Sequence, residues 1–228
     1  MRNKTLPLFF WLVVPILIIL GQIALEFSYT REELAPMHSE NGPHELLQSV
    51  YITFAFLLAV WMLFKVDWKA QRDVGIVVLV AALGSFYVAG EEISWGQHIL
   101  NWSTPEYWAA INDQNETNLH NTSSWLDQKP RILLFVGICA AGLLVPALRR
   151  WKAAWLPARF APLYPSDTLS VTALGVLLPY TVQEIAEDFY NGGVFARVSE
   201  VQELYMYYFV ALYLWDLYKR EISKVPLA

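Results

Sequence analysis

Long apolar stretches are the feature of this 228-residue sequence that most limits the folds open to it. The hydrocarbon core of a bilayer is about 30 Å thick, and about 20 apolar residues in a helix cross it. Several stretches approach that length, and 56% of all residues are hydrophobic while 16% are charged. We therefore predict an all-α polytopic membrane protein made of one integral membrane domain, residues 1–228. Its six transmembrane helices are predicted at about 6–27, 45–65, 74–99, 131–148, 168–188 and 200–218, with a polar outer loop at 101–129.

The first apolar stretch follows Arg2 and Lys4, and basic residues before an apolar core are also typical of a signal peptide. It is too long for a typical signal core and lacks a clear cleavage site, so we interpret it as a retained span.

The distribution of Lys and Arg predicts the orientation, because cytoplasmic segments hold the excess of these residues. With six spans, 12 of the 16 Lys and Arg fall on the side that carries both termini. We therefore predict that both termini are cytoplasmic and that the protein is a multi-pass protein of the cell inner (plasma) membrane. The chain has no basic patch with interleaved aromatics, so no nucleic acid partner is expected. Cys139 is the single cysteine, which excludes an intrachain disulfide.

The segment 90–98 (GEEISWGQH) brings ionisable side chains to the outer end of the third predicted span. Carboxylates at a membrane boundary are costly and usually have a task. Helical spacing predicts that Glu91, Ser94, Trp95 and His98 share one face of that span, with Glu92 on another face.

Polar residues from five predicted spans fall at one height. At a rise of about 1.5 Å per residue, they lie roughly 23–27 Å from the inner end of their spans. They are Gln22, Gln48, Glu91, Glu184 and Glu203. Because lone charges are unfavourable in lipid, we predict that they line one outward-facing pocket.

This pocket suggests two kinds of chemistry. Carboxylates brought together there would share protons, bind a cation, or use an arginine from the rim, namely Arg31, Arg131 or Arg197. Glu91, Glu184 and His98 are the candidate catalytic residues, since acid–base chemistry uses such groups. The candidate ligands of a divalent metal ion are Glu91, His98, His120, Glu184 and Glu203.

Structural interpretations stay open beside the functional ones. Glu91 and Glu92 could form a solvated helix end, and His98 and His120 could be hydrogen-bonding partners rather than ligands. His38 and His44 are interpreted as ordinary loop histidines. The tyrosines at 205, 207, 208 and 213 are interpreted as packing and interface residues.

The GEEISWGQ stretch at 90–97, together with the NLHN stretch at 118–121, resembles a pattern of uncharacterised bacterial multi-pass membrane proteins. That resemblance implies no activity. Glu91 and Glu92 also resemble the paired glutamates of CAAX-type membrane proteases, but Gly96 stands where that family has Arg. Zinc-dependent ceramidase-like membrane hydrolases place an acidic and histidine site near one membrane face, but their His-x-x-x-His pattern is absent from this sequence.

Three functions are compatible with these features. The leading hypothesis is a membrane-embedded enzyme, a hydrolase or transferase, that acts on a lipid or lipid-linked substrate. The alternatives are a proton- or cation-coupled carrier or binding protein, and a non-catalytic membrane assembly subunit. Membrane lipid is the expected partner, and a homo-oligomer or a membrane complex is left open.

Overall fold

A computed structural model describes residues 6–38, 42–190 and 192–223, apart from the side chains of His98, Ser124 and Asp127. Within these ranges the chain is helical and has no β-strand, as predicted. The long helices are α1 (Val14–Ser28, preceded by the π-turn η1, Phe9–Val13), α3 (Pro43–Leu63), α4 (Arg72–Glu92), α7 (Ser124–Cys139), α9 (Ser170–Tyr190) and α10 (Val198–Leu217).

Short helical elements connect the long ones. On one end of the bundle these are α2 (Arg31–Leu34), η2 (Ala35–His38), η3 (Ser94–Gly96), α5 (Gln97–Leu100), α6 (Glu106–Ile111) and η4 (His120–Thr122). α7 continues without a break through η5 (Ala140–Leu144) into α8 (Val145–Trp151). The remaining turns are η6 (Ala153–Trp155), η7 (Ala158–Leu163), η8 (Asp167–Leu169) and η9 (Tyr218–Ile222).

Five helices among the described residues are long and apolar enough to cross a membrane. They correspond to the first five predicted spans: α1, α3, α4, the continuous α7–α8 helix, and α9. This agrees with an all-α polytopic membrane protein. The fourth helix begins at Ser124, earlier than predicted, so that Pro130 lies inside it rather than before it.

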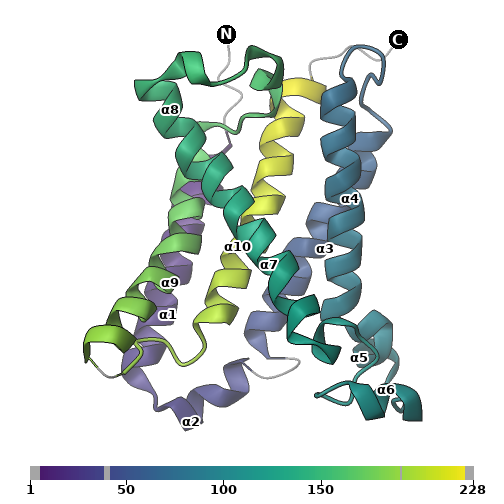
Figure 1. The fold of residues 1–228 in the computed structure, drawn as a ribbon, viewed down its shortest axis with the longest axis vertical. Coiled ribbons are helices and arrows are strands. Elements are labelled where there is room, and N and C mark those ends of the chain that lie inside the picture. The colour runs from purple at the N-terminus through teal and green to yellow at the C-terminus, as the bar shows by residue number, and fades with distance from the viewer. Residues whose placement is uncertain (1–5, 39–41, 191, 224–228) are drawn as a thin grey trace.

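α10 is not among these five helices, and it lies at the centre of the bundle. Thirteen of its 20 residues are buried. In Figure 1, α10 runs behind the diagonal α7, with α9 and α1 on one side and α3 and α4 on the other. A helix enclosed by protein on most sides does not need a lipid-compatible surface.

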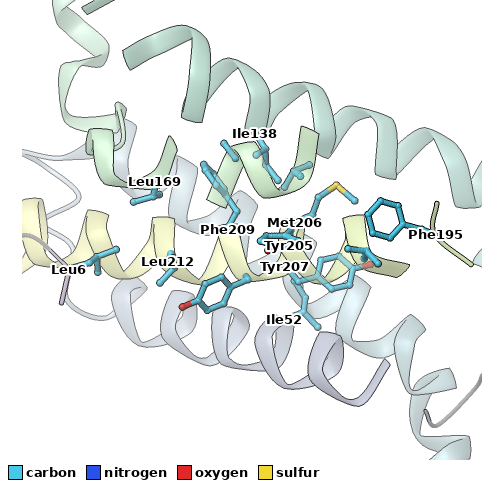
Figure 2. Packing of buried hydrophobic residues seen from close by; sticks show 14 residues of the cluster. Leu6, Ile52, Ile138, Leu169, Phe195, Tyr205, Met206, Tyr207, Phe209 and Leu212 are labelled. Carbon is cyan, nitrogen blue, oxygen red and sulfur yellow. The ribbon is translucent and has the colours of Figure 1, made fainter. Parts of the chain in front are cut away.

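Large side chains of α10 pack against its neighbours, and one of them, Tyr205, lies directly against a glycine. Tyr205, Met206 and Phe209 fill the space between α10 and its neighbours, with Ile138 of α7 and Ile52 of α3 on either side (Figure 2). Gly175 of α9 permits this arrangement, because a Cβ atom there would lie 2.2 Å from the ring of Tyr205. The hydroxyl of Tyr208 also donates to the carbonyl of Phe10 at 2.6 Å, which joins α10 to η1.

The two ends of the bundle differ in composition. α2, α5 and α6 lie at one end, and α8 lies at the opposite end (Figure 1). The α8 end carries the basic residues Arg149 and Arg150, and η9, which carries Lys219 and Arg220, continues α10 at the same end.

Candidate functional site

The third predicted span ends earlier than the sequence pattern indicates. α4 stops at Glu92, and Ser94, Trp95 and Gly96 then adopt left-handed conformations with φ of 46°, 54° and 104°. The prediction of one helix over 74–99, with Glu91, Ser94, Trp95 and His98 on a single face, is therefore wrong. Its physical reason is the turn after Glu92, where three successive residues with positive φ interrupt the helix. The side chain of His98 lies outside the described part of the structure.

Side-chain contacts hold this turn in its uncommon conformation. The indole of Trp95 folds back over Gly90, where a Cβ atom would lie 2.8 Å from the ring. Its Nε1 donates to Oε1 of Glu91 at 2.7 Å. Glycine at position 90 thus allows the Trp95 ring to lie directly against the backbone of α4.

Glu91 is a buried carboxylate whose oxygens are occupied by the protein. Besides the Trp95 bond at Oε1, its Oε2 accepts hydrogen bonds from the backbone N–H groups of Leu119, at 2.7 Å, and His120, at 2.8 Å. Nδ1 of His120 lies 3.3 Å from the same oxygen. The Glu91 side chain is 4% exposed. It therefore fixes the loop after α6 to the end of α4.

A second buried network completes this connection. Nδ2 of Asn118 donates to Oγ of Ser94 at 3.0 Å, and Oγ of Ser94 donates to Oε2 of Glu116 at 2.7 Å. Nδ2 of Asn112 donates to the carbonyl of Asn118 at 3.0 Å. All four side chains are buried. The two parts of the GEEISWGQ…NLHN pattern thus form one folded unit, which we call the loop network (Ser94, Asn112, Glu116, Asn118 and Glu91).

Glu92 points away from the loop network and toward α10. Its Oε1 accepts a hydrogen bond from the hydroxyl of Tyr207 at 2.9 Å. Nearby on the same wall, Nη1 of Arg131 donates to Oε1 of Glu203 at 2.8 Å. Arg131 is one of the three rim arginines that the sequence offered to carboxylates at this level, whereas Glu92 and Tyr207 were not among the predicted site residues.

These four residues line a cavity of about 1000 Å³ between α3, α4, α7 and α10. Its polar end also includes Glu45, Gln48, Glu200, Arg197 and His38. From there it continues along apolar residues of α4 and α7, as far as Val77 on α4 and Ala141 after α7. The volume is at the upper end of the range typical for small-molecule sites.

The flank of the cavity between α4 and α7 is open. Val80 and Leu133 both line it, yet they remain 64% and 75% exposed. Gly84 and Gly137 face it from opposite helices, and a Cβ atom at either position would meet nothing within 4 Å.

His38 and His44 are not ordinary loop histidines, so that prediction is wrong. Their rings are stacked with centroids 4.5 Å apart, and the residues are 4% and 7% exposed. The short helices α2 and η2 fold over the end of the bundle and bring the two imidazoles together there. Nη1 of Arg197 donates to the carbonyl of His38 at 3.1 Å.

The five polar residues that were predicted to line one pocket lie in separate places. Gln48, Glu91 and Glu203 line the cavity, whereas Glu184 and Gln22 do not. Glu184 is exposed on α9, where it bonds to Tyr180. Gln22 donates to Glu26 at 2.7 Å, and Glu26 in turn binds the backbone N–H of Ala196.

The candidate metal ligands are likewise separated. Glu91 and His120 are in contact, Glu203 is paired with Arg131, and Glu184 lies on another helix face. Among the described side chains, no group of three or more His, Cys, Asp or Glu is arranged to hold a metal ion.

The chain matches no protein-family model, no curated protein and no solved structure. The arrangement of the cavity and the loop network is therefore the basis for any functional argument.

Proposed function

We propose that the protein is an enzyme of the inner membrane that acts on the headgroup of a lipid or lipid-linked substrate. The single observation that carries this proposal is the cavity, which joins a polar end containing Glu92, Tyr207, Glu203 and Arg131 to a long apolar wall. Its open flank between α4 and α7 would admit an acyl chain directly from the bilayer.

In this proposal α10 is the sixth transmembrane span, and both termini are cytoplasmic. A helix of 20 residues is about 30 Å long, enough to cross the hydrocarbon core. The basic residues at the α8 end support that end as the cytoplasmic one. The polar end of the cavity would then lie near the outer face of the membrane.

Glu92 takes the acid–base role that the sequence analysis gave to Glu91 and Glu184. Its carboxylate faces the cavity and is held by the Tyr207 hydroxyl, so that a carboxyl and a phenol are adjacent at the polar end. Such groups donate and accept protons when they lie within hydrogen-bonding reach of a substrate. Arg131, paired with Glu203, lines the same end of the cavity.

Binding is tested by measuring the lipids that remain with the purified protein. We expect native mass spectrometry to detect bound lipid in the wild type and to detect at least about 10-fold less in Gly137→Leu, which fills the cavity. The matched control is Gly21→Leu, because Gly21 is also an exposed helix glycine with open space around it but does not line the cavity. Equal lipid retention in Gly137→Leu and Gly21→Leu would contradict the proposed binding site.

Catalysis is tested by incubating the purified protein with a total bacterial membrane lipid extract and comparing lipid composition. We expect the wild type to convert at least one lipid class and Glu92→Gln to leave it unchanged. Identical lipid profiles from wild type and Glu92→Gln, both with lipid bound, would reject the enzyme and leave a binding protein.

A further inference from the structure

The polar end of the cavity has more acidic than basic side chains. Glu45, Glu91, Glu92, Glu200 and Glu203 line it, against Arg131 and Arg197. Arg131 pairs with Glu203, and Nη2 of Arg197 lies 3.8 Å from Oε1 of Glu200. Glu91 is stabilised by the backbone N–H groups of Leu119 and His120.

Glu92 differs from these carboxylates in its surroundings. Among the described side chains, its hydrogen-bond partner is the neutral hydroxyl of Tyr207. A carboxylate in a partly apolar cavity is stabilised by an opposite charge that comes close to it. A bound ligand can supply that charge.

The second observation is the unsatisfied imidazole of His38. The residue is 4% exposed and lines the cavity, and neither Nδ1 nor Nε2 has a hydrogen-bond partner. A neutral imidazole has one nitrogen that accepts a hydrogen bond, and a buried polar atom without a partner is unfavourable. The polar end therefore holds an imidazole nitrogen without a donor, and its carboxylates outnumber its arginines.

We propose that the ligand of this cavity is an amphiphile with a primary ammonium headgroup and a long alkyl chain. An ammonium supplies a positive charge and three N–H donors, which matches the Glu92 carboxylate and the acceptor nitrogen of His38. The alkyl chain lies along the apolar wall between Glu92 and Val77, a distance of about 22 Å along α4. This inference rests on the proposed lipid-binding function and adds the chemistry of the headgroup.

An anionic headgroup fits this end less well. Both arginines that line it already contact carboxylates, at 2.8 Å for Arg131 and 3.8 Å for Arg197. A phosphate or sulfate without an amine would bring a further negative charge toward Glu92, which is unfavourable. The headgroup charge is therefore the property to vary in a test.

The test compares three probes of equal chain length in nonionic detergent micelles at pH 7: tetradecylamine, tetradecanol and tetradecyl sulfate. Isothermal titration calorimetry on the full-length wild-type protein is expected to give at least about 10-fold tighter binding for the amine than for the alcohol, and weaker binding for the sulfate. Glu92→Gln is expected to remove most of the amine preference while the affinity for the alcohol stays unchanged. Asp188→Asn, which alters an exposed carboxylate on α9, is the matched control and should keep the preference.

The outcomes separate this inference from the proposed function. Equal binding of all three probes to the wild type, or an amine preference that persists in Glu92→Gln, overturns the ammonium headgroup but leaves the lipid site. Absence of binding for every probe overturns both. The ranking of the probes on the wild type does not depend on whether Glu92→Gln folds.

Discussion

Glu91 and Glu92 are neighbours in the sequence, but their carboxylates lie in opposite kinds of environment. Glu91 belongs to the loop network, and its oxygens accept hydrogen bonds from two backbone N–H groups of the loop and from the indole of Trp95. Glu92 faces the cavity, where it meets the Tyr207 hydroxyl and open volume. Successive residues of a helix point about 100° apart, so adjacent carboxylates are directed to different surroundings.

This difference distinguishes a structural carboxylate from a candidate site residue. A buried carboxylate that accepts several protein hydrogen bonds has less capacity left for a ligand. A carboxylate on a cavity wall with one neutral partner retains that capacity. Glu91 therefore stabilises the loop, and Glu92 is the carboxylate that we propose binds the ligand.

The largest expected effect is the loss of stability on changing Glu91. We expect Glu91→Gln to lower the free energy of unfolding by about 3 kcal/mol, because it removes a charged acceptor from buried donors. The matched variant Glu92→Gln should change it by less than about 0.5 kcal/mol. Unfolding by SDS titration in mixed micelles, followed by circular dichroism, measures both. Equal losses in the two variants would mean that the two carboxylates do not differ in role.

Asn118→Ala should have the next largest effect. Asn118 is fully buried, and its removal deletes the hydrogen bonds that its side chain makes with Ser94 and Asn112, so we expect a loss of about 2 kcal/mol. Gln128→Ala, an exposed amide at the start of α7, serves as the control and should be neutral in the same SDS titration. A neutral Asn118→Ala would show that the loop network does not stabilise the fold.

The ion pair on the cavity side can be measured with a double-mutant cycle. We expect Arg131→Met to lower the free energy of unfolding by about 1.5 kcal/mol in the wild type. In a Glu203→Gln background the loss should be about 1 kcal/mol smaller. The Arg131 and Glu203 side chains are 26% and 16% exposed, so solvent screens the pair in part. Additive effects of the two substitutions would exclude a coupling between these residues.

Trp95→Phe should give the smallest effect. Phenylalanine keeps a ring over Gly90 but lacks the Nε1–H group that donates to Glu91, so we expect a loss of about 1 kcal/mol. A Trp68→Phe variant, whose indole donates at 3.4 Å to the carbonyl of Leu63, controls for tryptophan loss elsewhere. A larger loss for Trp68→Phe would indicate that the Trp95 bond contributes little.

Hydropathy and spacing predicted most of the fold because burial in lipid acts on long stretches of sequence. The first five spans were located to within a few residues at most ends. The end of α4 could not be predicted, because the turn at Ser94–Gly96 depends on contacts with Glu116 and Asn118, more than 20 residues later. That His38 and His44 are buried was missed for a similar reason, since it depends on how α2 and η2 fold over the bundle.

The sequence pattern did not predict the direction in which each polar side chain of the candidate site points. The rise per residue placed Gln48, Glu91, Glu184 and Glu203 at one level, but it contains no information on which neighbour each helix face meets. Glu184 therefore lies outside the cavity, and Glu92 was left out of the predicted site although it faces the cavity. Tyr207 could not be separated from the packing tyrosines around it, because only its contact with Glu92 distinguishes it.

Amide hydrogen exchange of residues 112–122 tests most directly whether Glu91 holds the loop while Glu92 serves the cavity. The backbone N–H groups of Leu119 and His120 should exchange slowly in the wild type and in Glu92→Gln, and at least about 10-fold faster in Glu91→Gln. Unchanged exchange in Glu91→Gln, or equally fast exchange in Glu92→Gln, would contradict the division of roles between the two glutamates.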